Sequence, residues 1–124
     1  MPTRPKVFCL IGSVLLVFMA AFHGSGYGFI RGAIRDSDAA SFLKEIVPVL
    51  FVHPSYHLLG LAGFGILGLF LKEGNWKVWF LVAGLVLGDA GLGFAVGGPI
   101  PGGLLSLAAL CFLIAGWMAR RSRA

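Results

Sequence analysis

The sequence predicts an all-α protein, a bundle of four antiparallel transmembrane helices, and three observations support this fold class. The 124 residues are 58% hydrophobic and 12% charged, whereas soluble domains are about 45–50% apolar and about 25% charged. The second observation is that the apolar residues lie in four long runs, as they do in multi-pass membrane proteins. Third, Lys and Arg stand at the ends of these runs, where topology signals occur.

The four spans are predicted over residues 7–30, 46–71, 78–96 and 104–118, within a single domain that covers residues 1–124. At a rise of about 1.5 Å per residue, these lengths suit a hydrocarbon core about 30 Å thick. The first two spans are long enough to tilt, and the fourth is the shortest. An alternative interpretation treats the first span as a signal peptide cleaved near its Met-Ala-Ala segment, residues 19–21.

Two connecting segments have a predicted structure of their own. In the first loop, RGAIRDSDAASFLKE, we expect Asp36, Ser37 or Asp38 to cap a short helix that runs through residues 39–43 into the second span. The apolar face of that helix, which includes Phe42, is expected to lie on the outer membrane surface. The third loop, GGPIPGG, is expected to be a tight turn that stops one helix and starts the next.

The distribution of basic residues predicts the orientation. Seven Lys and Arg residues lie at the two termini and in the second loop, and three lie in the first loop. This bias predicts that both termini are cytoplasmic, and the short loops fit a bacterial inner membrane. Trp76, Trp79 and Trp117 fall near the cytoplasmic span ends, where indole rings settle at the headgroups. The basic residues form no patch with interleaved aromatics, so nucleic acid is not an expected partner.

Ionisable side chains interrupt the apolar runs and define the candidate site. Each costs about 2.5 kcal/mol or more inside hydrocarbon, which makes it a functional hypothesis by default. Counting from the loops places His23 and His53 at equal depth, about 10 Å below the outer boundary. The imidazole of His57 lies one turn deeper on the same helix face, and Asp89 falls in the same outer half. The side chains expected to converge are His23, Tyr27, His53, Tyr56, His57 and Asp89.

Several kinds of chemistry suit this set of side chains. His23, His53 and His57 are acceptable ligands for copper, zinc or haem iron, with Asp89 orienting one imidazole. Asp–His chains also recur as proton relays in membranes. Asp89 and His57 form a candidate acid–base pair for catalysis. The remaining interpretation is structural, in which these groups hydrogen-bond one another and hold helices together.

The first functional hypothesis is a non-enzymatic membrane protein that binds a ligand, proton or metal, or serves as an accessory subunit. The second is a membrane enzyme performing acid–base chemistry, such as isomerisation, on a lipid-soluble substrate. The third is an oligomeric small-solute transporter, because one four-helix chain is thin for a pore. The expected partners are the lipid bilayer and either further copies of the chain or another membrane-complex subunit.

Small residues form stripes on two of the predicted helices. Gly84, Gly88, Gly91 and Ala95 follow one face of the third span, and a looser stripe follows the second. Small residues let helices approach closely in lipid, and we expect these stripes to pack inside the bundle rather than in a dimer. The two cysteines lie inside apolar runs and are expected to be buried free thiols.

Three stretches carry a resemblance to a known family. They are MAAFHGSGYG, the Tyr56-His57 pair followed by LLGLAGFGIL, and PIPGGLLSLAALCFLIAGW. These stretches resemble the YgdD-like family of small four-span bacterial inner-membrane proteins, which has mitochondrial relatives. The resemblance implies the four-span topology and adds nothing on mechanism, since that family has no known activity. Asp89 departs from the family's pattern, which has small hydroxyl residues in that segment.

Overall fold

The structure, a computed structural model, describes residues 3–122, and within this range it is all-helical with no strands. Four stretches are long and apolar enough to cross a membrane, which agrees with the four predicted spans: Arg4–Arg35, Ser41–Phe70, Asn75–Gly97 and Pro99–Arg121. The elements in chain order are α1 (Thr3–Ser25), α2 (Tyr27–Arg35), α3 (Ser41–Phe70), α4 (Asn75–Leu92), the π-helix η1 (Gly93–Gly97) and α5 (Pro99–Arg121).

The first candidate span consists of two helices that meet at Gly26. The Gly26 amide donates to the carbonyl of His23 in a turn, with an N···O distance of 3.1 Å, and α2 then continues to Arg35. A Cβ at position 26 would lie 3.0 Å from the ring of Phe51 in α3. The absence of a side chain at Gly26 therefore lets this junction lie directly against α3.

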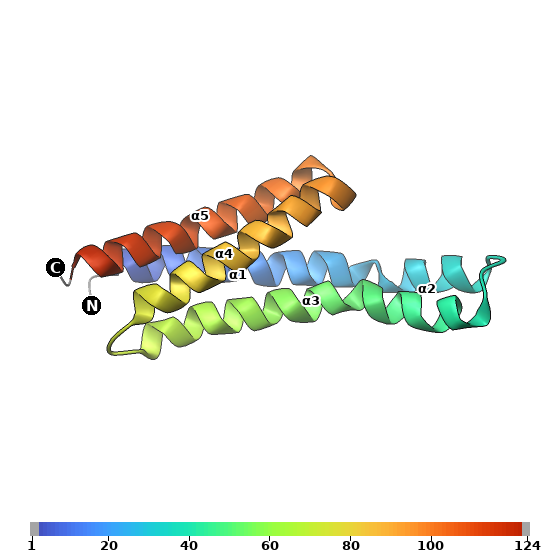
Figure 1. Cartoon of the computed structure of the whole chain (residues 1–124), viewed down its shortest axis with the longest axis horizontal. Coiled ribbons are helices and arrows are strands. Elements are labelled where there is room, and N and C mark those ends of the chain that lie inside the picture. The colour runs from blue at the N-terminus through green and yellow to red at the C-terminus, as the bar shows by residue number, and fades with distance from the viewer. Residues whose placement is uncertain (1–2, 123–124) are drawn as a thin grey trace.

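The predicted start and cap of the short helix over residues 39–43 were wrong. The loop spans residues 36–40, and α3 begins at Ser41 with Ala40 as an N-cap that makes no side-chain hydrogen bond. Instead, Asp36 is the C-cap residue of α2, and its amide donates to the Gly32 carbonyl. The predicted continuation into the second span is confirmed, because the residues around Phe42 form the first turn of α3 (Figure 1).

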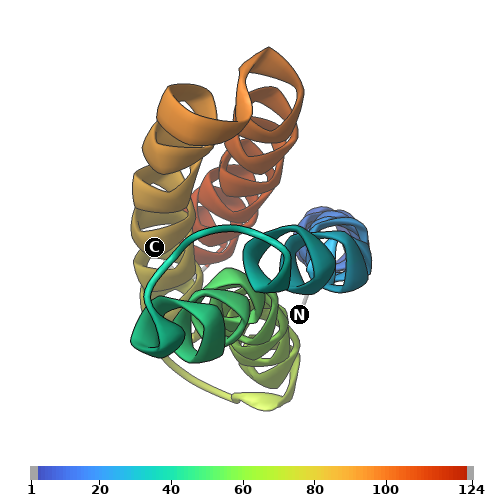
Figure 2. The ribbon, with the colours of Figure 1, turned by 90° about the vertical axis from the view of Figure 1, so that its right-hand side faces the viewer.

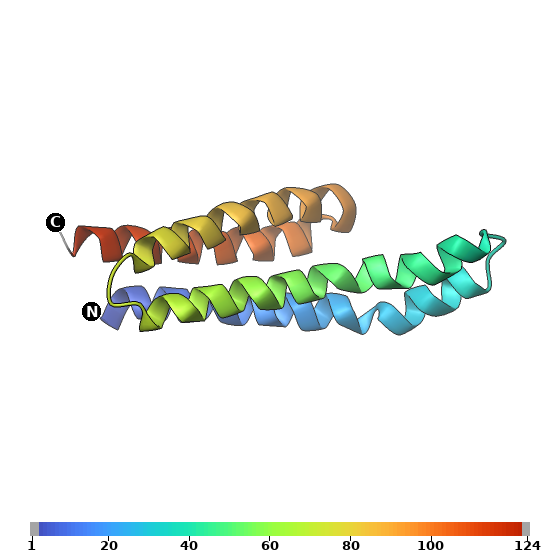
Figure 3. The ribbon, with the colours of Figure 1, turned by 60° about the horizontal axis from the view of Figure 1, so that its bottom comes forward.

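The helices form two pairs of unequal length. In Figure 1, α1 with α2 lies alongside α3, and α4 lies alongside α5. Both ends of the chain and the α3–α4 loop lie at one end of the molecule (Figures 1 and 3). The first span is nine residues longer than the third, a difference of about 14 Å along a helix. As a result, α2 and the start of α3 extend past the turn that joins α4 to α5.

The two pairs separate toward the α2 end. Viewed from that end in Figure 2, the turn between α4 and α5 stands away from α2 and α3. The most extensive interfaces are those of α4 with α5, α1 with α3 and α1 with α5, whereas α3 and α4 contact each other much less. The α3–α4 interface is therefore the sparsest of the main helix contacts in the bundle.

The core depends on glycines that face two large aromatic rings. A Cβ at Gly65 would lie 2.6 Å from the ring of Phe112, and one at Gly12 would lie 2.9 Å from the same ring. Likewise, a Cβ at Gly68 would meet the indole of Trp79. Both rings are fully buried. These absent side chains create the space that lets α1, α3, α4 and α5 pack around the aromatic rings.

One backbone carbonyl in this core accepts two side-chain donors. The Trp79 Nε1–H donates to the Gly65 carbonyl at 3.0 Å, and the Cys9 thiol donates to the same oxygen at 3.1 Å. The prediction that Trp79 anchors at the headgroups was therefore wrong, because Trp79 is a core residue. The prediction of buried free thiols is confirmed for both Cys9 and Cys111.

The small-residue stripe on α4 lies outside the bundle, contrary to prediction. A Cβ added at Gly84, Gly88 or Gly91 would meet nothing within 4 Å. The buried face of α4 instead includes Val86 and Ala90, on the opposite side of the helix. On α3 the outcome is mixed: of the predicted stripe, Gly68 is packed while Gly60 and Gly63 are open, and the packed Gly65 was not among the stripe residues.

The third loop is shorter than the sequence suggests. The π-helix η1 extends the third span to Gly97, and Gly98 adopts a left-handed φ of 87°. Helix α5 then begins at Pro99, five residues before the predicted start of the fourth span. Proline is well suited to the first turn of a helix, where its missing amide has no partner to lose.

Candidate functional site

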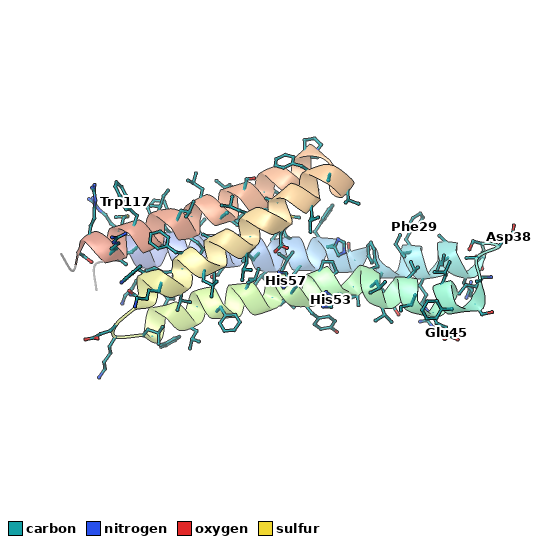
Figure 4. All side chains as sticks on the ribbon, in the orientation of Figure 1. Phe29, Asp38, Glu45, His53, His57 and Trp117 are labelled. Atoms are coloured by element: carbon teal, nitrogen blue, oxygen red, sulfur yellow. The ribbon has the colours of Figure 1, made fainter. Side chains whose placement is uncertain are left out.

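The contact that stands out joins the two helices of the sparsest interface. His57 of α3 and Asp89 of α4 approach with Nε2 and Oδ2 3.1 Å apart. Their side chains are 39% and 22% exposed, respectively. Figure 4 places His57 midway along α3, between the charged loop near Asp38 and the end that carries Trp117. The structure thus brings together two of the six predicted site residues, from helices that are far apart in sequence.

Asp89 lies in the half of the third candidate span that is farther from the end with both termini. At about 1.5 Å per residue, Asp89 is about 12 Å from Gly97 and about 21 Å from Asn75. Its neighbours along α4 are apolar or glycine from Val78 to Ala90, apart from Asp89 itself. The carboxylate is therefore well removed from either end of the candidate span that carries it, Asn75–Gly97.

Helical periodicity explains why these two residues meet. Leu58 and Ala62 are on the buried face of α3, and His57 lies about 100° around the helix from Leu58. Similarly, Asp89 precedes the buried Ala90 and lies on the flank of the buried face of α4. Both side chains therefore lie at the edge of the core, on the flanks where α3 and α4 face each other.

The contact is an ion-pair approach without a fully formed hydrogen bond. Asp89 Oδ2 is buried and has no hydrogen-bond partner of acceptable geometry, although His57 Nε2 is 3.1 Å away. A carboxylate and an imidazole at this distance are neutral overall with one shared proton, whichever group carries it. The arrangement therefore avoids an isolated charge among apolar side chains, which is the costly state in a membrane.

His23 is engaged elsewhere, in a contact that ties α1 to α3. Its Nε2 lies 2.7 Å from the carbonyl oxygen of Phe51, and its ring stacks on the Phe51 ring with centroids 4.4 Å apart. Because a carbonyl can only accept, the proton of this hydrogen bond is on Nε2 of the imidazole. This is the structural role that the sequence left open for His23.

A buried polar residue close to this contact was missed by sequence reasoning. Ser55 lies one turn after Phe51 and is buried, and its hydroxyl oxygen has no hydrogen-bond partner within the described chain. A serine inside a helix commonly donates to the carbonyl four residues earlier, which here is the oxygen that His23 contacts. A serine two residues before His57 in an apolar run was the available signal.

The other three predicted residues do not join the pair. His53 and Tyr56 are exposed on the surface of α3, and Tyr27 is half-buried in α2. No hydrogen bond or ion pair among residues 3–122 connects any of them to His57 or Asp89. His53 lies one turn closer to α2 (Figure 4), toward the end where α4 and α5 stand away from α3 (Figure 2).

The predicted metal or haem site lacks a ligand set in the part of the chain that the structure describes. No three His, Cys, Asp or Glu side chains are grouped closely enough there to hold a metal ion. Of the three candidate ligands, His23 is bound to a carbonyl, His53 is exposed and His57 contacts Asp89.

An open groove lies on another side of the molecule, between α1 and α3. Its volume is about 290 Å³. The groove offers apolar surface of the kind that a lipid chain covers, and it contains none of the predicted site residues; it is lined by Leu10, Ser13, Val14, Val17, Phe18 and Ile66. The His57–Asp89 pair is therefore the candidate functional site of this protein.

The chain matches none of the protein-family models, curated proteins or solved structures with which it was compared.

Proposed function

We propose that this chain is a non-enzymatic protein of a bacterial inner membrane, with four antiparallel spans and both termini in the cytoplasm. In this proposal the His57–Asp89 pair binds an exchangeable proton in the outer half of the bilayer. The observation that carries the proposal is the 3.1 Å approach of His57 Nε2 to Asp89 Oδ2 between two apolar helices. The excess of basic residues at the end with both termini supports the orientation.

The composition of the pair favours a proton over other ligands. Imidazole is the side chain that commonly gains and loses a proton near neutral pH. An imidazole beside a carboxylate therefore forms a pair that can bind different numbers of protons. Two ligating side chains are too few for a tightly held metal ion, and the described residues supply no third. Histidine and aspartate in membrane spans commonly serve as proton sites.

The exposure of the pair supports exchange of that proton. His57 retains 39% of its side-chain surface and Asp89 retains 22%. A proton site needs a path to water or to a partner protein, and the part of the pair that the chain leaves uncovered is where such a path would reach it. Asp89 is about 12 Å from Gly97 at one end of its candidate span and about 21 Å from Asn75 at the other, so the outer side is the shorter route.

Infrared titration of the full chain in lipid vesicles tests the proposal. We expect a carboxyl band that changes with pH as the pair gains or loses its proton. The band should vanish in Asp89→Asn and shift its midpoint in His57→Gln. His53→Gln is the matched control, because His53 lies one turn away and makes no contact with Asp89. A band unaffected by Asp89→Asn would overturn the proposal.

A second candidate function is favoured by the partial exposure of His57. If the surrounding bilayer reaches the imidazole, His57 and Asp89 could exchange protons with a lipid-soluble substrate as an acid–base pair. Such an enzyme should retain a bound lipid-soluble molecule that mass spectrometry detects in the purified protein. Undiminished turnover of that molecule by Asp89→Asn would exclude the catalytic hypothesis while leaving the infrared experiment unaffected.

A further inference from the structure

The end of the molecule that carries both termini is strongly cationic. Among residues 3–122 its only acid is Glu73, whereas its cations are Arg4, Lys6, Lys72, Lys77, Arg120 and Arg121. The opposite end is balanced, with the cations Arg31, Arg35 and Lys44 and the acids Asp36, Asp38 and Glu45. A partner that recognises charge would therefore distinguish one end of the molecule from the other.

Two of these cations are held on a single indole ring. The Nζ of Lys77 and the guanidinium carbon of Arg120 each lie 5.5 Å from the ring centroid of Trp76. Lys77 and Trp76 are in the first turn of α4, and Arg120 is in the last turn of α5. The ring itself is fixed by an edge-on contact with Phe80, with centroids 6.0 Å apart. Cations from two helices are thus positioned around one rigid group.

Three of the cations at this end, Lys77, Arg120 and Arg121, have no counter-ion among the described residues. Among residues 3–122, no carboxylate lies within 4.0 Å of Lys77, Arg120 or Arg121. The face of an indole attracts a cation, but it does not cancel the repulsion between two cations that share the ring. A phosphate oxygen placed between them would do so, and guanidinium and ammonium groups are the usual phosphate binders.

The surface below Lys77 suits an acyl chain. Leu81 lies one turn further along the same face of α4 and is 64% exposed. Beyond it, Gly84 and Gly88 leave a smooth strip with nothing within 4 Å of a Cβ. The hydrocarbon tail of a lipid whose headgroup binds Lys77 would therefore pass Leu81 and then lie along the open surface at Gly84 and Gly88.

We propose that Lys77 and Arg120, positioned by Trp76, bind the phosphate of an anionic phospholipid whose acyl chain lies along Gly84 and Gly88. The proposal depends on insertion of the chain in a membrane and is independent of the proton site. The occupant is a lipid rather than a soluble phosphate because the cation pair lies at the ends of two candidate spans. Basic clusters at this depth commonly bind anionic headgroups.

Native mass spectrometry of the full chain, with equal amounts of phosphatidylglycerol and phosphatidylcholine, tests the proposal. We expect retention of phosphatidylglycerol, and we expect Lys77→Gln or Arg120→Gln to weaken it about fivefold each, at about one surface cation's contribution. The matched controls are Arg31→Gln and Arg35→Gln, which remove equal charge at the opposite end and should leave retention unchanged. Equal losses in the controls would show general charge attraction and overturn the site.

Two further measurements separate the headgroup from the tail. Gly84→Leu removes no charge, and its Cβ would have no neighbouring protein atom within 4 Å, yet it should reduce phosphatidylglycerol retention by obstructing the acyl strip. Inorganic phosphate at the concentration of the lipid should not displace the bound phosphatidylglycerol. Displacement by phosphate alone, or full retention in both Gly84→Leu and Lys77→Gln, would refute the proposal.

Discussion

The most direct test of the packing is the addition of one methyl group at Gly65. A Cβ at this position would lie 2.6 and 2.8 Å from two atoms of the Phe112 ring and 2.8 Å from the hydroxyl oxygen of Ser13. The Phe112 ring is fully buried and has little freedom to move aside. Gly60 offers a matched control, because it lies on the same helix with nothing within 4 Å of an added Cβ.

The two variants share one energetic effect and differ in another. Replacing glycine by alanine inside a helix contributes about 1 kcal/mol of helix propensity in either case. Overpacking a filled core costs about 1–3 kcal/mol, and it applies only at position 65. We therefore expect Gly65→Ala to unfold about 1–3 kcal/mol more easily than Gly60→Ala, because the propensity term cancels in the comparison.

Equilibrium unfolding in mixed detergent micelles, followed by far-ultraviolet circular dichroism, measures this difference. A second variant identifies its cause: Phe112→Leu shortens the ring that the new methyl group would meet, so the penalty of Gly65→Ala should shrink in the Phe112→Leu background. Equal stability of Gly65→Ala and Gly60→Ala would refute the argument, as would a penalty that is undiminished in the Phe112→Leu background, where only the contact with Ser13 should remain.

Three further predictions concern contacts between helices. Trp79→Phe removes the donor to the Gly65 carbonyl and should lower the unfolding free energy by about 0.5–1.5 kcal/mol in the same micelle titration. His23→Phe removes the hydrogen bond to Phe51 and should cost about 0.6 kcal/mol, up to roughly 1.7, detectable as a lower thermal midpoint. Both native cysteines are buried, so a maleimide should label them only after unfolding in sodium dodecyl sulfate, and rapid labelling of the folded protein would contradict this core.

Hydrophobic length predicted the elements well, and the positions where it failed have physical causes. The apolar runs located four helices because a span needs a minimum of apolar residues, whatever its neighbours are. The helices extend further than the runs because polar residues near a helix end can remain helical outside the hydrocarbon. Thus α3 begins at Ser41, before the apolar run, and α1 is followed by α2 across Gly26.

The candidate site was harder to predict because depth says nothing about direction around a helix. His23, His53 and His57 all occur in the outer half by residue counting, yet only His57 meets Asp89. His23 contacts a backbone carbonyl. Every residue carries such a carbonyl, so the sequence does not indicate which one a histidine will contact. Tyr56 lies on the opposite side of α3 from the core and is 69% exposed. Which residues meet depends on how the helix pairs cross, and composition does not encode that angle.

The location of Asp89 follows from how α3 and α4 are held together. Near the end with both termini, the indole of Trp79 fills the space at Gly68 and donates to the Gly65 carbonyl, so that region is fixed by shape and one hydrogen bond. His57 and Asp89 lie about ten residues further out on each helix, or about 15 Å. There the helix pairs separate, and a polar contact between longer side chains can bridge a distance that small residues cannot. A structural role and a proton-binding role for the pair are therefore compatible. The carboxylate and the imidazole connect α3 and α4 because each neutralises the charge of the other. Binding or loss of a proton changes those same charges, so it would also change the contact between the two helices.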